Sequence, residues 1–105
     1  ESRFVEDNNG KTEYQLNFGE VPINAFWSII VYDNDGFIYD KGNNSLNNFT
    51  TIPNNDGTYT INFSNDNNKI NNLNIGNGWN YIIRMYEPRK EILEGTWQFP
   101  KDEKV

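Results

Sequence analysis

Alternating polar and apolar residues predict that this chain is built from β-strands. The segment 12–18 alternates polar and apolar residues from Glu13 onward, and 58–63 repeats the pattern after the turn signal Asp56-Gly57. Each segment therefore has one face suited to a core and one suited to solvent. The residues expected to point inward from these two segments are Tyr14, Leu16, Phe18, Tyr59, Ile61 and Phe63.

Two further segments, 25–33 and 79–86, are apolar on both faces and predict central strands that are covered on both sides. Arg84 is the one charged residue in the second segment. The first ends at Asn34-Asp35-Gly36, a strong turn signal, and 37–39 is expected to return beside it as a hairpin. The side chains expected to form most of the core are Trp27, Ile29, Val31, Tyr59, Ile61, Phe63, Tyr81, Ile83 and Trp97.

Turn-forming residues dominate the connections between these strands. The segment 40–55 is expected to be a long loop with at most a short strand, and 64–78 is expected to be mobile because it has few apolar residues. Pro88 ends the last strand, and 88–94 is expected to form a short helix with Gly95 at its C-terminal cap. The pattern predicts an all-β protein: a single-domain antiparallel β-sandwich of jelly-roll type over residues 1–105, with at most one short helix near 88–94.

The composition is informative mainly because certain residue types are missing. The chain of 105 residues has no Cys and no His, so it lacks thiol nucleophiles, thiolate zinc ligands and the usual general base at neutral pH. Its net charge of −6 argues against a nucleic-acid partner, and no apolar run approaches the roughly 20 residues of a membrane span. Twenty residues are Asn, an excess typical of AT-rich genomes. We expect no cofactor, and the composition does not indicate a cellular compartment.

Several short motifs follow one another along the chain, namely Phe18-Gly19, Val21-Pro22-Ile23-Asn24-Ala25-Phe26-Trp27-Ser28, Tyr32-Asp33, Asp35-Gly36-Phe37, Asp56-Gly57, Arg84-Met85-Tyr86-Glu87-Pro88 and Ile92-Leu93-Glu94-Gly95-Thr96-Trp97-Gln98-Phe99-Pro100. In this order and spacing they resemble the family of the domain of unknown function 1214. The resemblance covers about residues 14–105 and implies a β-sandwich of jelly-roll type with no established activity. In bacterial proteins that domain usually follows a domain of unknown function 1254, which implies a partner domain.

The chain departs from this family pattern at two places. Asn43-Asn44-Ser45 stands where the family has Asn-Arg-Tyr, and Asn72-Leu73-Asn74 stands where it has Asn-Trp-Leu-Pro. A family site built from those residues would therefore be damaged in this chain.

Four residues are candidates for binding: Trp79, Arg84, Asn44 and Asn72. Trp79 follows Asn77-Gly78 at a strand entry and is expected to reach solvent, where its ring could stack on a sugar. Arg84 lies in an apolar strand and needs a partner, either a structural ion pair with Asp33 or Glu91 or an anion or carboxylate ligand. Asn44 and Asn72 mark the two departures from the family pattern.

Asp33, Asp35 and Asp40 offer the oxygen ligands that calcium prefers. Their spacing falls short of an EF-hand loop, and the hairpin turn already explains Asn34-Asp35-Gly36. No metal site is predicted.

The sequence favours a non-catalytic β-sandwich that binds a protein or a glycan, with a partner domain or a homo-oligomer as the expected assembly. One alternative is a carbohydrate-active hydrolase or enzyme fragment that uses paired carboxylates, since that chemistry needs neither His nor Cys. Another is a structural component of a virus particle, where jelly rolls are frequent. None of the fifteen carboxylates lies in a recognisable catalytic motif, so no catalytic residue is named.

Overall fold

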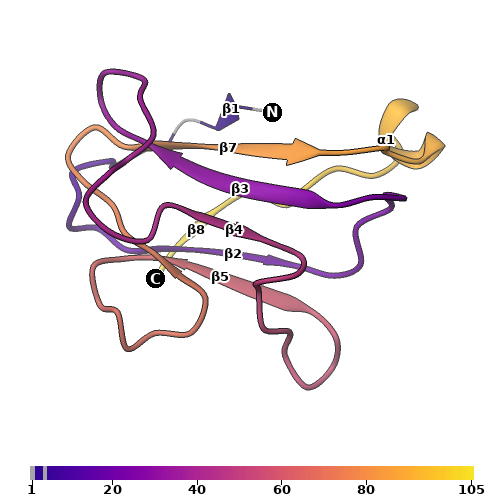
Figure 1. Ribbon diagram of the computed structural model, residues 1–105, viewed down its shortest axis with the longest axis horizontal. Helices are drawn as coiled ribbons and strands as arrows, with labels where there is room; N and C mark the ends of the chain where they lie inside the picture. Colours follow the sequence, from indigo (N-terminus) through magenta and orange to yellow (C-terminus); the bar gives the residue numbers. More distant parts are fainter. Residues whose placement is uncertain (1, 4) are drawn as a thin grey trace.

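Two sheets pack face to face around one apolar core in the computed structural model, which describes residues 2–3 and 5–105 (Figure 1). The first sheet has the strand order β1-β7-β3-β4, with β1 (Ser2–Arg3), β7 (Asn80–Met85), β3 (Trp27–Tyr32) and β4 (Ser45–Asn47). The second has the order β6-β5-β2-β8, with β6 (Asn72–Leu73), β5 (Tyr59–Phe63), β2 (Tyr14–Phe18) and β8 (Glu103–Lys104). The β-sandwich predicted from the sequence is confirmed.

The two central strands of the first sheet are buried on one face only, so the expectation that both faces would be covered is wrong. In β3, Trp27 is 2% exposed, and Ile29 and Val31 are 0% exposed. The alternate residues of β3 are only half-buried. The second sheet packs against one side of the first, and the apolar residues on the other side remain in partial contact with solvent.

The predicted core is largely confirmed. Tyr59 and Trp97 are only partly buried, although both pack against the core cluster. The predicted core residues that are buried are Trp27, Ile29, Val31, Ile61, Phe63, Tyr81 and Ile83. Strand β6 and the connections contribute further buried residues that the strand patterns did not identify, namely Val5, Val21, Leu73, Ile75, Trp79 and Phe99.

Residues 37–39 do not form the expected second strand of a hairpin with β3. Residues 37–39 return only as far as a single bridge between Tyr32 and Ile38, and Phe37 is 72% exposed. The expected short strand in the segment 40–55 is instead the neighbour of β3: Leu46 of β4 lies opposite Ile29.

The segment 64–78 contains a strand that the sequence analysis missed. β6 pairs parallel with β5, with Asn72 opposite Asn62 and Leu73 opposite Phe63. Every other strand pair among the described residues is antiparallel. The strand was missed because it is two residues long and lies among turn formers.

The predicted short helix is present as α1 (Lys90–Leu93). It ends at Glu94, and Gly95 follows with a φ of +76°, the left-handed conformation that commonly terminates helices. Within the described residues, no helix has the length and apolar character needed to cross a membrane.

Candidate functional site

Trp79 lies in the centre of the core, so the expectation that its ring reaches solvent is wrong. Its side chain is 0% exposed, and its ring stacks on Phe63 with the centroids 5.1 Å apart. Trp79 has the same strand phase as Tyr81 and Ile83, and this phase sets the direction of the ring despite the neighbouring turn. Trp79 is therefore a packing residue and not a platform for a sugar.

Arg84 is exposed, and neither of its expected ion pairs, with Asp33 or with Glu91, is present. Its Nη2 donates a hydrogen bond to the hydroxyl of Tyr32 at 3.3 Å. A bond to Tyr86 and the charge interaction with Tyr32 raise the pKa of the Arg84 guanidinium. No carboxylate of the described residues forms an ion pair with Arg84.

Arg84 belongs to a surface that we call the outer face, the side of the first sheet that points away from the core. Strand register places Ile30 opposite Ile82 and Ser28 opposite Arg84. To reach Tyr32, the aliphatic stem of Arg84 must cross the Ile30–Ile82 pair, so its charge lies above an apolar strip. The outer face consists of Phe26, Ile30, Tyr32, Phe49, Ile82, Arg84 and Tyr86.

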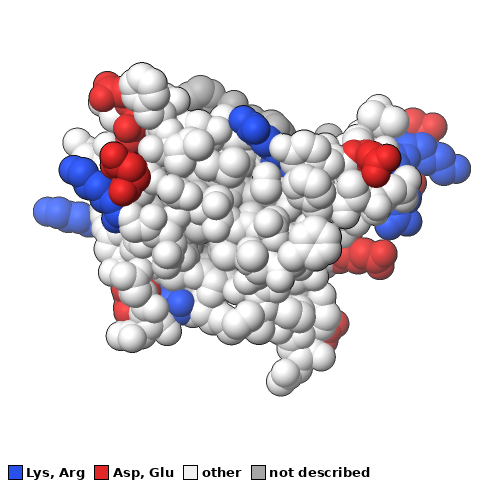
Figure 2. Space-filling view, in the orientation of Figure 1, with Lys and Arg blue, Asp and Glu red and all other residues white. Residues whose placement is uncertain are grey.

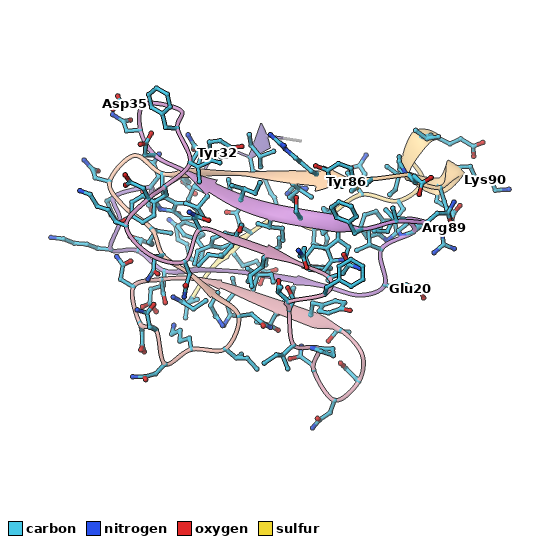
Figure 3. The ribbon with its side chains drawn as sticks, in the orientation of Figure 1. Glu20, Tyr32, Asp35, Tyr86, Arg89 and Lys90 are labelled. Atoms are coloured by element: carbon cyan, nitrogen blue, oxygen red, sulfur yellow. The ribbon has the colours of Figure 1, made fainter. Side chains whose placement is uncertain are left out.

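An aromatic cluster forms one end of the outer face. Phe26 and Tyr86 stack with ring centroids 4.2 Å apart, and Phe49 lies 6.4 Å from Phe26. Phe49 is 76% exposed, although it is among the largest apolar side chains of the protein. Figure 3 shows Tyr32 and Tyr86 toward opposite ends of the β3–β7 pair, so the outer face runs along both strands.

Charged side chains gather at the two ends of the molecule in Figure 2, and few lie on the surface between them. Figure 3 places Asp35 at one end, on the turn after β3, and Arg89 and Lys90 at the other end beside α1. On the face that Figure 2 shows, the uncharged region between the ends is therefore suited to contact with another molecule.

Asn44 and Asn72 lie together in a second feature, a hollow of about 520 Å³ that we call the amide hollow. It lies between β4 and β6, which are the edge strands of the two sheets on the same side of the sandwich. Its walls are formed by 42–46, Thr50 and Ile52 on one side and by Asn67, Lys69, Asn71 and Asn72 on the other.

Two asparagine clamps hold the walls of the amide hollow together. Asn71 accepts a hydrogen bond from the amide of Ile52 at 2.9 Å and donates to its carbonyl at 2.8 Å. The side-chain oxygen of Asn74 accepts a hydrogen bond from the backbone amide of Asn43 at 2.8 Å. The backbone amide of Asn74 donates to the Asn43 carbonyl at 2.9 Å. Gly42 allows this close approach, because a Cβ there would collide with the Asn74 side chain.

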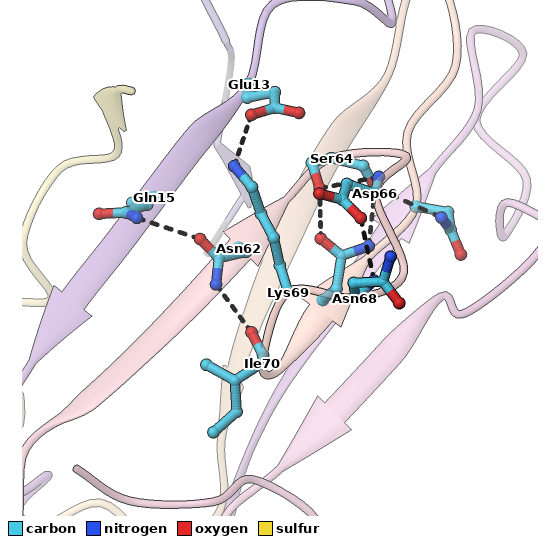
Figure 4. A network of polar contacts seen from close by, with 10 residues as sticks. Glu13, Gln15, Asn62, Ser64, Asp66, Asn68, Lys69 and Ile70 are labelled. Carbon is cyan, nitrogen blue, oxygen red and sulfur yellow. Dashed lines mark hydrogen bonds and ion pairs between the residues drawn. The ribbon is translucent and has the colours of Figure 1, made fainter.

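Polar contacts lie close to these clamps, and Figure 4 shows several of them, including the Lys69–Glu13 pair and the bonds of Asn62 to Gln15 and Ile70. Asn72 is 7% exposed; it donates to the Ser64 carbonyl at 2.8 Å and accepts from the Ser64 hydroxyl at 2.5 Å. Lys69 pairs with Glu13, and Asn62 donates to the Ile70 carbonyl at 2.7 Å. Asn72 is thus a structural residue whose amide is fully used inside the protein.

The carboxylate of Asp33, in the turn after β3, has a structural role. Asp33 accepts hydrogen bonds from the amides of Asp35 at 2.9 Å and Phe37 at 3.0 Å. These bonds shape the turn after β3. In the part of the chain that the structure describes, no group of three or more acidic, His or Cys side chains is arranged to hold a metal ion.

A smaller hollow of about 250 Å³ beside α1 contains two carboxylates. It is lined by Glu20, Pro22, Arg89, Glu91 and Trp97. Arg89 lies 3.6 Å from Glu20, whose side chain is 88% exposed. This is the place where the paired-carboxylate alternative would need its acid and base.

The sequence analysis identified Arg84, Asn44 and Asn72 but not the residues that surround them in the structure. Asn71 and Asn74 were grouped with a mobile loop, and Phe26 and Tyr86 with a covered strand face. Asn71 has a φ of +49°, a left-handed conformation that Asn tolerates better than most residues. The clamps depend on contacts between segments far apart in the chain, so no local sequence pattern predicts them.

Comparisons with known proteins agree with this architecture. The crystal structure of the VPA0106 protein from Vibrio parahaemolyticus is similar with a TM-score of 0.82 and 25% sequence identity, over 93% of this chain and 27% of that one. The chain therefore spans about a quarter of the length of that protein. None of the curated proteins compared with it matches. The model of the family described as "Protein of unknown function (DUF1214)" matches residues 5–90, most of the chain, and the chain belongs to this family.

Proposed function

We propose that this protein is a non-catalytic interaction module that uses its outer face to bind another folded protein or domain. The observation that carries the proposal is Arg84, a cation without a carboxylate partner among the described residues, on an apolar and aromatic surface. Aromatic residues and Arg are enriched where protein interfaces gain most of their affinity.

The partner that fits this surface presents apolar side chains around a carboxylate. The carboxylate would form an ion pair with the guanidinium of Arg84, which Tyr32 already orients. The apolar groups would cover Ile30, Ile82 and the aromatic cluster. An ion pair enclosed by apolar contacts is shielded from water and is stronger than one on an open surface. The net charge of −6 makes the absence of an internal carboxylate partner for Arg84 more informative.

The length of VPA0106 supports a domain as the partner. The shared fold accounts for only 27% of that chain, so most of VPA0106 lies outside it and is available to contact a sheet face. In this protein the corresponding partner would be a further segment or a separate chain.

Site-specific photocrosslinking tests the proposal. A photoreactive phenylalanine at position 49 should give a discrete adduct with one protein in cells of the source organism. The same group at position 37 is the matched control, because Phe37 is 72% exposed and Phe49 is 76% exposed, but only Phe49 lies on the outer face. Arg84→Glu should abolish the adduct and weaken the purified complex at least tenfold. Equal adducts from both positions, or an adduct that survives Arg84→Glu, would contradict the proposal.

The hydrolase alternative is tested in parallel. Glu20 and Glu91 line one hollow with Trp97, which is the arrangement that two-carboxylate chemistry would use. A screen of oligosaccharides with the wild-type chain, Glu20→Gln and Glu91→Gln decides the matter. Turnover that either substitution abolishes would replace the interaction module with an enzyme.

A further inference from the structure

The amide hollow has unused hydrogen-bonding groups that the fold does not consume. The side chain of Asn43 makes no hydrogen bond within the described chain. Asn44 donates its Nδ2 to the Tyr39 carbonyl at 2.8 Å, which leaves its Oδ1 as an acceptor. Asn67 accepts from Asn74 at 2.9 Å, which leaves its Nδ2 as a donor. These groups supply both donors and acceptors around one space.

The hollow is almost free of net charge. Lys69 is the only ionisable residue in its lining, and its ammonium pairs with Glu13. An anion would therefore find no free cation, and a metal ion would find no carboxylate among the lining residues. Leu46 and Ile52 add aliphatic surface, but no aromatic ring lines the hollow for a nucleobase to stack on.

We propose that the amide hollow binds a neutral carbohydrate. Each sugar hydroxyl can both donate and accept a hydrogen bond, and the free amide groups of Asn43, Asn44 and Asn67 together offer both donors and acceptors. The C–H faces of a sugar ring suit the aliphatic surface of Leu46 and Ile52. A peptide fits less well, because peptide recognition relies on pockets for large apolar anchors, and the hollow offers only these two aliphatic residues.

The asparagine clamps prepare the hollow before any ligand arrives. Asn71 ties the wall at Ile52, and Asn74 ties the wall at Asn43, each through two hydrogen bonds. Walls already fixed by the fold lose little conformational freedom on binding, which favours affinity. The volume of about 520 Å³ is within the range of small-molecule sites.

The experiment titrates the chain with neutral oligosaccharides of glucose, mannose and N-acetylglucosamine, beside a uronic-acid oligosaccharide and a random peptide library. Binding is followed by ligand-observed NMR and by chemical shifts of the asparagine side-chain amides. We expect at least one neutral oligosaccharide to bind. Asn43→Ala should weaken binding about threefold to tenfold, as expected for loss of one hydrogen bond, with unchanged melting temperature. The matched control Asn68→Ala removes an exposed amide outside the lining and should bind like wild type.

Three outcomes would overturn the inference. One is no binding of any neutral oligosaccharide at millimolar concentration. Another is binding that Asn43→Ala leaves unchanged, which would place the sugar elsewhere. The third is Asn43-dependent binding of peptides or of uronic acid in place of neutral sugar. Arg84→Glu should leave sugar binding intact, so this inference and the proposed role of the outer face can fail independently.

Discussion

At the scale of single residues, asparagine has two roles in this protein that its frequency alone does not distinguish. Asn71 uses both ends of its side-chain amide to hold a distant backbone segment, and Asn74 uses its side-chain oxygen and its backbone amide. The Asn43 side chain, in contrast, remains unbonded in the amide hollow. A primary amide suits clamping because it presents one donor group and one acceptor with the geometry of a peptide bond. Burial and hydrogen-bond use therefore separate structural from binding asparagines.

Trp79 provides the prediction at this scale. Trp79→Ala should lower the free energy of unfolding by about 3–5 kcal/mol, because it leaves a large cavity between the sheets. Trp79→Phe should cost only about 1–2 kcal/mol, since the indole Nε1 has no hydrogen-bond acceptor among the described residues and only volume is lost. Urea denaturation measures both values. Phe37→Ala, at a side chain 72% exposed, is the control and should change stability by less than about 0.5 kcal/mol.

At the scale of elements, β6 depends on side chains more than on its own backbone ladder. It has two residues, and an isolated pair of that length would not persist in water. Asn72 fixes it to β5 through Ser64, and Leu73 is 0% exposed in the core. The segment 64–78 therefore combines ordered and solvent-exposed parts, while its mobility remains a prediction.

Asn72→Ala tests this account of β6. It removes one acceptor and one donor from buried Ser64 groups, so the free energy of unfolding should fall by about 1–3 kcal/mol. Hydrogen exchange should show faster exchange of the Ser64 amide, which donates to the Leu73 carbonyl. Asn68→Ala in the same segment is exposed and should leave both measurements unchanged. Equal effects of the two substitutions would show that the network of Asn72 does not stabilise β6.

At the scale of the whole molecule, polar contacts join the two ends of the chain to the first sheet. Arg3 in β1 donates to the carbonyls of Phe99 at 3.0 Å and Pro100 at 2.9 Å. Tyr81 in β7 donates its hydroxyl to Asp102 at 2.7 Å. Burial, and then the bond to Asp102, raise the pKa of the Tyr81 hydroxyl above its ordinary value of 10.0. These contacts hold the C-terminal segment across the sandwich.

This shift predicts how stability changes at alkaline pH. Above a pH of about 10 the unfolded chain loses the Tyr81 proton while the folded protein retains it, so stability falls as pH rises. The slope is about 1.4 kcal/mol per pH unit for each proton that only the folded state holds. Tyr81→Phe should make this decline shallower, whereas the surface substitution Tyr86→Phe should keep it. Urea denaturation at neutral pH and at several values above about 10 measures the slopes, and equal slopes for wild type and Tyr81→Phe would refute the assignment.

The four longest strands, β2, β3, β5 and β7, follow from the sequence alone, as do the β-sandwich class, the short helix and most of the core. They do so because the two-residue period, the turn signals around Gly36 and Gly57, and Pro88 all act locally. The sequence also contained the motifs of the family. The burial of Trp79 followed from the same period but was obscured by the adjacent Asn77-Gly78 turn.

Which surfaces are covered depends on the tertiary structure and does not follow from the sequence pattern. The pattern of β3 made both faces apolar, but the second sheet covers one face and leaves Phe26, Ile30 and Tyr32 on the other. Likewise, no local pattern could show that Asn71 would meet Ile52 or that Asn74 would meet Asn43, because these contacts form only when the edges of two sheets come together. Periodicity specifies the two faces of a strand, whereas the packing of distant segments determines what lies against each face.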